Sequence, residues 1–132
     1  MNKAYDRINW DFLHDVLLKF GFSDFFVTRI MKCVSSVSFS ILVNNVKTRQ
    51  FVPSCGLRQG DPLSPYFFIL VSQALSSILS FLNDNGICKG VAISKLSPPV
   101  SHFLFADDCF IFNRFKPEDV WILKWVLSAY CV

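Results

Sequence analysis

The chain has 132 residues, of which 52% are hydrophobic, 16% aromatic and 17% charged. This length suits one domain, and so apolar a composition excludes a disordered chain. The net charge of +3 is compatible with a nucleic-acid partner but is too small to argue for one. Because so short and apolar a chain cannot cover all of its hydrophobic surface, we expect some to stay exposed, as in a piece of a larger protein.

The cysteines and histidines form no recognisable site in the sequence. The cysteines are Cys33, Cys55, Cys88, Cys109 and Cys131, an odd number without a CxxC pair. This pattern predicts neither a zinc site nor a disulfide framework, and it favours a reducing compartment. His14 and His102 form no matching constellation with acids or cysteines, so we expect each to be structural or exposed.

Two helices are predicted near the N-terminus. Asn9 can cap a helix from Trp10 to Phe20, and Gly21 can end it. Ser23 can cap a second helix from Asp24 to about Val34. The predicted apolar face of the second helix includes Phe26, Val27, Ile30 and Met31.

A β-hairpin is predicted next. The segment from Ser38 to Val43 is β-prone, Asn44 and Asn45 mark a turn, and Val46 to Val52 alternates enough for a return strand.

The stretch from Gly56 to Pro65 reads as a rigid turn that leads into a long helix. Gly56 and Gly60 allow unusual backbone angles and close approach by a ligand or another backbone. We predict Ser64 as the N-cap and Pro65 as the first helical residue, which leaves free N–H groups for an anion. Arg58, Gln59 and Asp61 add a cation, an amide and an acid. A ligand-binding loop and a simple connector both fit this pattern.

The following helix is uncharged over residues 62–83 and is predicted to end near residues 83–86. Length alone would allow a membrane span. A polar stripe argues against one, and it consists of Ser72, Gln73, Ser76, Ser77 and Ser80. The opposite face carries Leu70, Val71, Ala74, Leu75, Ile78 and Leu82. We therefore predict an amphipathic or buried helix of a soluble protein, with no membrane partner.

The last third is predicted to hold a brief strand from Gly90 to Ser94, a hairpin, and a final helix from Pro117 through Tyr130. Asp107 and Asp108 lie between two apolar stretches, at the expected tip of the hairpin. Aspartate is common in turns, yet adjacent carboxylates repel each other and are preferred ligands of Mg²⁺, so both interpretations stay open. The predicted fold is α+β, with helices on one face of a small antiparallel sheet.

Three motifs in order, KAYDRINW, GLRQGDPLSP and FADD, resemble the reverse transcriptase of LINE-type (non-LTR) retrotransposons, close to the plant members. The resemblance covers nearly the whole chain. It implies a partial reverse transcriptase domain over residues 1–132: the polymerase palm with part of the fingers, and no thumb. It also implies RNA-directed DNA polymerase activity with an RNA template, a DNA primer and deoxynucleoside triphosphates, the missing remainder of the polymerase as a partner, and an intracellular, nuclear location.

The resemblance also implies a metal site. Asp107 and Asp108 match the acidic pair that holds two Mg²⁺ ions, or Mn²⁺, during nucleotidyl transfer. A third acid belongs to a first motif of the form acid-x-x-Lys-Ala-aromatic-Asp, and Lys3 to Asp6 matches its second half. By that spacing the third acid would precede Met1, so we expect this chain to be inactive by itself. Asp6 is a separate acid in the pattern and is not expected to replace it.

Nucleotide-binding residues follow from the same resemblance. Tyr5 matches the aromatic residue that lies under the sugar and excludes a 2′-hydroxyl, although a core aromatic would look the same. Gln59 and Gly60 match the loop that packs on the incoming nucleotide and its template base. Arg58 belongs to that loop, and Lys3 could contact nucleic acid, but both could also be solvated side chains.

An alternative function is a non-catalytic nucleic-acid-binding remnant, or a retroelement relic without selected function. Lys47, Arg49 and Arg58 are the basic cluster that such a remnant would use.

Overall fold

The computed structural model describes residues 5–94, 96–105, 108–114 and 116–131. The elements are a short 3₁₀ helix η1 and, in chain order, four helices and four strands. Their bounds are η1 Tyr5–Arg7, α1 Trp10–Lys19, α2 Asp24–Ser35, β1 Leu42–Val43, β2 Val46–Lys47, α3 Ser64–Asp84, β3 His102–Phe105, β4 Asp108–Ile111 and α4 Pro117–Tyr130.

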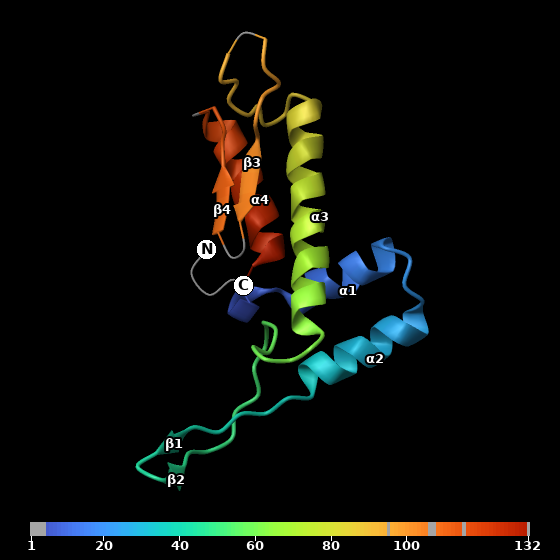
Figure 1. The fold of residues 1–132 in the computed structure, drawn as a ribbon, viewed down its shortest axis with the longest axis vertical. Coiled ribbons are helices and arrows are strands. Elements are labelled where there is room, and N and C mark those ends of the chain that lie inside the picture. Colours follow the sequence, from blue (N-terminus) through green and yellow to red (C-terminus); the bar gives the residue numbers. More distant parts are fainter. Residues whose placement is uncertain (1–4, 95, 106–107, 115, 132) are drawn as a thin grey trace.

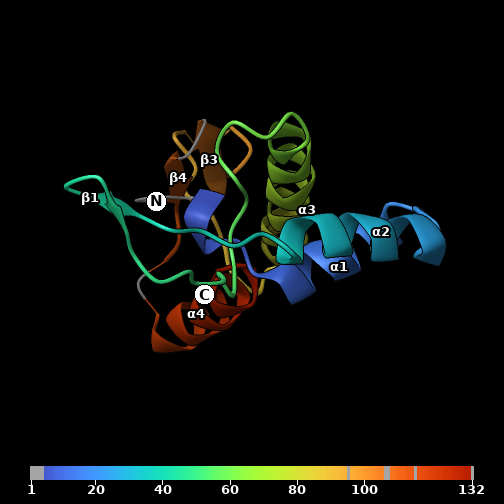
Figure 2. The same ribbon diagram turned by 90° about the horizontal axis from the view of Figure 1, so that it is seen from below.

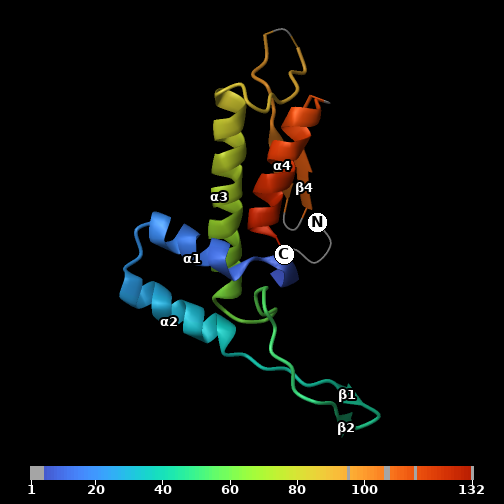
Figure 3. The same cartoon turned by 180° about the vertical axis from the view of Figure 1, so that it is seen from behind.

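Helix α3 is the axis on which the other elements are arranged. Figure 1 shows α1 and α2 crossing beside its first half, while the β3–β4 hairpin runs along its second half. Helix α4 covers one face of that hairpin, as the view from behind shows (Figure 3). The β1–β2 hairpin projects away from the other elements (Figures 1 and 2).

The predicted caps of the first two helices are confirmed. The Asn9 side chain accepts a hydrogen bond from the backbone N–H of Asp11 at 2.8 Å, and the Ser23 hydroxyl accepts one from Phe26 at 3.4 Å. These bonds satisfy N–H groups that have no partner within the helix. Gly21 has a φ of +88°, as expected of the residue that ends α1.

The predicted hairpin turn is also confirmed. Asn44 and Asn45 have φ values of 48° and 63°, which a tight two-residue hairpin turn requires. The two strands are shorter than predicted, and a single antiparallel bridge between Phe39 and Phe51 continues the pairing. Both strands are exposed on both faces, so no core packing supports longer pairing.

The predicted start of α3 is wrong by one residue. Leu63 is the N-cap, whereas Ser64 is the first helical residue and is buried. The Asp61 carboxylate accepts a hydrogen bond from the Leu63 N–H at 2.8 Å, which holds the turn before the helix, and no described side chain caps the first N–H groups of α3 itself. Pro65 follows within the first turn, where its missing N–H costs no helical hydrogen bond.

One stripe of α3 is buried, and its apolar members are Phe67, Val71, Leu75, Leu79 and Leu82. By length and composition alone α3 could cross a membrane. In this structure α1 and β3 pack against it, while Ile69 and Phe81 of the same helix are exposed.

The α+β class is confirmed, but the predicted single sheet is wrong. The described residues form two separate two-stranded antiparallel sheets, β1–β2 and β3–β4. The strand predicted from Gly90 to Ser94 is reduced to one bridge between Val91 and Val100. Sheet pairing joins segments far apart in sequence, which local patterns do not specify.

The core lies where α1, α2, α3 and α4 meet. Its fully buried members with the largest side chains are Ile8, Leu13, Leu17, Val27, Val71 and Leu75. Phe26, predicted on the apolar face of α2, is exposed and stacks on Phe22 instead. The expected uncovered apolar surface is present, and its aromatic members include Phe25, Tyr66, Phe81, Phe105, Trp121 and Trp125.

Candidate active site

The first motif is bound directly to the glycine-rich loop. The Leu57 N–H donates to the Tyr5 carbonyl at 2.7 Å, and the Gly56 N–H donates to the Ile8 carbonyl at 2.8 Å. A Cβ on Gly56 would lie 2.7 Å from the Asp6 carbonyl oxygen, nearer than real Cβ contacts come. The predicted close backbone approach at Gly56 is therefore confirmed, and the approaching backbone is that of Asp6.

The end of α4 holds the same segment from another side. Ile8 forms an antiparallel bridge with Cys131, and the Asn9 N–H donates to the Tyr130 carbonyl at 3.2 Å. Tyr130 is buried, which raises the pKa of its hydroxyl, and the Ser72 side chain of α3 lies close enough to act on that pKa. The Gly56 loop, α3 and α4 therefore fix the position of η1 and of the residues that follow it.

Tyr5 lies half-buried against the first turns of α3. Its ring stacks on that of Phe68 with the ring centroids 4.5 Å apart and the planes 10° from parallel. Such stacking contributes about 0.5–1.5 kcal/mol beyond burial and fixes the plane of the tyrosine ring. Packing on one side supports the core-aromatic interpretation, while partial exposure still leaves Tyr5 accessible to a ligand.

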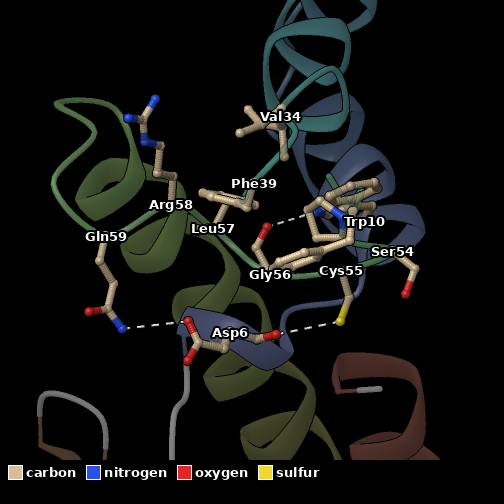
Figure 4. A pocket seen from close by; sticks show the side chains of 13 residues that line it. Asp6, Trp10, Val34, Phe39, Ser54, Cys55, Gly56, Leu57, Arg58 and Gln59 are labelled. Carbon is tan, nitrogen blue, oxygen red and sulfur yellow. Dashed lines mark hydrogen bonds between the residues drawn. The ribbon is translucent and has the colours of Figure 1, made fainter. Parts of the chain in front are cut away.

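The polar residues of the loop face solvent beside η1. Arg58, Gln59 and Gly60 are all exposed. The Gln59 amide nitrogen lies 3.5 Å from an Asp6 carboxylate oxygen, whereas the Arg58 side chain points away from Asp6 (Figure 4). Gly60 has a φ of +86° with no atom within 4 Å of the position that a Cβ would take, so its value to the loop is conformational freedom alone.

A cavity of about 650 Å³ opens beside this loop. Its walls combine residues of the loop, of η1, of the end of α2 and of the segments before β1 and after β2 (Figure 4). The Trp10 ring N–H donates to the Gly56 carbonyl at 2.8 Å, and the Cys55 thiol donates to the Asp6 carbonyl at 3.4 Å. An apolar hollow with Asp6, Arg58 and Gln59 along its wall is typical of a small-molecule site.

The described part of the third motif lies at the end of the β3–β4 hairpin that is next to η1 (Figure 1). Asp108 is the exposed first residue of β4 and pairs with Phe105, the last of β3. All three views place η1 next to this end of the hairpin (Figures 1, 2 and 3). Asp107 and Lys3, which the sequence also assigned to the site, lie outside the described residues.

Of the acidic pair expected to bind metal, the structure describes Asp108. The Asp108 carboxylate has the oxygen chemistry that Mg²⁺ prefers. Among residues 5–94, 96–105, 108–114 and 116–131, no three His, Cys, Asp or Glu side chains come together as metal ligands. The donor type of Asp108 fits the expected ion, and a full set of ligands needs further carboxylates.

Two thiols near the site, those of Cys109 and Cys131, are not suited to act as nucleophiles. Burial raises the pKa of Cys109 in β4 and of Cys131 after α4. A raised pKa keeps both thiols protonated at neutral pH, and a protonated thiol is a poor nucleophile.

Sequence reasoning missed three partners of the site. Trp10 holds the Gly56 carbonyl, Asp6 accepts from Gln59, and Phe68 carries the Tyr5 ring. Each contact joins residues far apart in the chain. The sequence indicated one of these contacts through Gly56, because a glycine lets a second backbone come close.

The family model described as "Reverse transcriptase (RNA-dependent DNA polymerase)" matches residues 1–129. The chain is 30% identical over 112 residues to the retrovirus-related Pol polyprotein of the type-2 retrotransposable element R2DM of Drosophila melanogaster, covering 85% of this chain and 10% of that protein. It is 28% identical over 108 residues to the Pol polyprotein of the type-1 retrotransposable element R2 of Popillia japonica, covering 82% of this chain and 17% of that protein.

An uncharacterized mitochondrial protein of Arabidopsis thaliana is 45% identical over 67 residues, which are 51% of this chain and 55% of that protein. The chain therefore spans a small part of the polyproteins and about half of the mitochondrial protein. The resemblance to reverse transcriptases of non-LTR retrotransposons is confirmed.

Proposed function

Because this chain belongs to the reverse transcriptase family, we propose that it forms the nucleotide-binding and metal-binding part of a retroelement RNA-directed DNA polymerase. The observation that carries the proposal is the docking of η1 on the Gly56 loop, beside the hairpin end that Asp108 occupies. The described residues of the three motifs lie around the Asp108 end of the β3–β4 hairpin (Figure 1). We assign this end to the polymerase palm.

Each residue has a role in the proposed site. Asp107 and Asp108 would hold Mg²⁺, which neutralises charge on the phosphates and keeps attacking and leaving oxygens in line. Tyr5, fixed by Phe68, would lie under the sugar of the incoming nucleotide. Gln59 and Gly60 would pack on the nucleotide and its template base, and Arg58 would lie at the edge of the same loop. An RNA template and a DNA primer would approach this end.

Nucleotide binding tests the loop and the tyrosine. We expect dTTP in the presence of Mg²⁺ to bind the 132-residue chain, and Tyr5→Ala or Gln59→Ala to weaken binding about tenfold, a loss of about 1.4 kcal/mol. The matched control is Gln73→Ala, which removes an exposed glutamine of α3. Equal affinity in all four proteins, measured by titration calorimetry, would refute the assignment.

The chain alone is expected not to polymerise. It carries two of the three carboxylates of the family's site, and losing one removes several kcal/mol of charge stabilisation in the transition state. The assay supplies poly(rA)/oligo(dT), dTTP and Mg²⁺ or Mn²⁺. Incorporation above that of the Asp107→Ala, Asp108→Ala double variant would overturn this expectation while supporting the family's activity.

A further inference from the structure

Helix α4 has two different sides. The inner side faces the core through Val126 and Tyr130, which are 5% and 2% exposed. The outer side carries Trp121 and Trp125, which are 68% and 74% exposed. Residues four apart lie above one another on a helix, about 6 Å along its axis. The two indole rings are therefore neighbours on the solvent side, where burial does not explain them.

Cations accompany these rings. The Lys124 ammonium lies 5.3 Å from the centroid of the Trp121 ring, within cation–π distance. An apolar groove of about 410 Å³ lies beside this ring, lined by Lys116, Pro117, Val120, Trp121 and Lys124. Its lining combines two positive charges with apolar and aromatic surface. Asp119 is buried, whereas Glu118 is exposed three residues before Trp121 on the same side of the helix, so this side carries two lysines and one acid.

We propose that this outer side of α4, formed by Lys116, Trp121, Lys124 and Trp125, binds a single-stranded nucleic acid. Bases stack on the two indole rings, and the lysines contact the phosphates on either side. Exposed aromatic rings beside cations are typical of proteins that bind single-stranded nucleic acid without sequence specificity. An apolar protein partner would have to bury both lysine charges, which is unfavourable without acids to pair them.

This surface is separate from the candidate active site. Helix α4 begins at the end of the β3–β4 hairpin away from Asp108 (Figure 1), and its outer side faces away from the hairpin that it covers (Figure 3). A single-stranded nucleic acid bound on α4 would make a second contact with the protein, apart from the candidate active site. The inference needs neither metal nor nucleotide, so it stands or fails independently of the proposed polymerase role.

The test is fluorescence anisotropy of a labelled 12-nucleotide oligo(dT) titrated with the 132-residue chain, without Mg²⁺ or dTTP. We expect Trp121→Ala with Trp125→Ala to weaken binding at least tenfold, and Trp121→Phe with Trp125→Phe to retain most of it, because phenylalanine keeps a stacking face. Lys116→Gln with Lys124→Gln should lower the slope of log K against log salt by about 1.4.

The matched control is Phe25→Ala. Phe25 is 67% exposed on α2 and lies under the Arg29 guanidinium at 4.0 Å, so it is another exposed aromatic with a cation over its ring. We expect it to leave binding unchanged. Circular dichroism of every variant separates a lost contact from a lost fold, and a variant that unfolds is replaced by the corresponding single alanine variant.

Three results would overturn the inference. One is equal binding by the tryptophan variants and the unchanged chain. Another is dependence on Lys47 and Arg49 of the β1–β2 hairpin instead, measured with the Lys47→Gln, Arg49→Gln variant. The third is self-association through α4, seen as a dimer in sedimentation that the tryptophan variants abolish.

Discussion

Gly56 lies so close to Asp6 that a side chain on the glycine would collide with the Asp6 backbone. A Cβ there would come 2.7 Å from the Asp6 carbonyl oxygen, and the glycine has a φ of +90°. Gly56→Ala is therefore expected to lower the free energy of unfolding by about 2–4 kcal/mol, from steric clash and left-handed backbone together. Urea denaturation measures the change.

Gly60→Ala is the matched control for this prediction. Gly60 has nearly the same backbone angle, with a φ of +86°, but nothing lies within 4 Å of its Cβ position. Its substitution should cost about 1–2 kcal/mol from backbone strain alone. Equal losses for the two variants would show that contact with Asp6 does not matter.

Tyr130→Phe is expected to destabilise the chain by about 1 kcal/mol. The Tyr130 hydroxyl is buried and the Ser72 side chain acts on its pKa, so we expect the two hydroxyls to interact and the Tyr130→Phe change to remove that interaction. A double-mutant cycle with Ser72→Ala, read by urea denaturation, should show coupling between the two sites. Tyr66→Phe removes a hydroxyl from a tyrosine that is 66% exposed and should change nothing.

Stability is expected to fall as the pH drops below about 6.5. The ring nitrogens of His102 lie 2.7 Å from the Ser76 hydroxyl and 2.8 Å from the Ser101 hydroxyl, and burial lowers the pKa of His102 from its usual 6.5. The folded chain thus binds fewer protons than the unfolded chain below that pH. The stability that His102 contributes is present above pH 6.5 and is lost as the pH falls through its folded pKa.

Thermal unfolding between pH 5 and pH 7 measures this dependence. His102→Gln should flatten it because the titrating ring is gone. His14→Gln, which removes the exposed histidine of α1, should leave it intact. An unchanged slope for His102→Gln would rule out His102 as its source.

Thiol reactivity should follow burial. Cys33 is exposed on α2, whereas Cys88 is buried, and burial together with the nearby Asp119 charge raises the pKa of the Cys88 thiol. Iodoacetamide should label Cys33 well before Cys88, as read by mass spectrometry of peptides. In concentrated urea both sites should react alike. Early labelling of Cys88 in the folded chain would contradict its placement in the core.

Local signals predicted the helices and the asparagine turn well. Asn9, Ser23 and Pro117 mark helix starts through their own backbone chemistry, so neighbouring residues suffice to recognise them. Ser64 misled the prediction because α3 begins one residue earlier than expected, with Leu63 at the N-cap and no side-chain cap among the described residues. Phe26 misled it because periodicity does not say which face a neighbouring element will cover.

The sequence predicted the motifs of the candidate site but not the contacts that bring them together. Nothing in the sequence says that Tyr5 stacks on Phe68 or that Ile8 binds Gly56, because these pairs depend on how α3 and the loop pack. The polar stripe of α3 was predicted, but the residues that its serines contact were not. Ser76 of that stripe lies 2.7 Å from a ring nitrogen of His102 and joins α3 to β3, while Ser72 lies close enough to Tyr130 of α4 to act on its pKa.

The bridge between Ile8 and Cys131 also constrains the order of folding. These two residues are far apart in sequence, so their pairing closes a long loop. On the ribosome, Ile8 has to wait until Cys131 has been synthesised and has emerged before it can pair. Until then the Ile8 side chain, which is fully buried in the folded chain, stays uncovered.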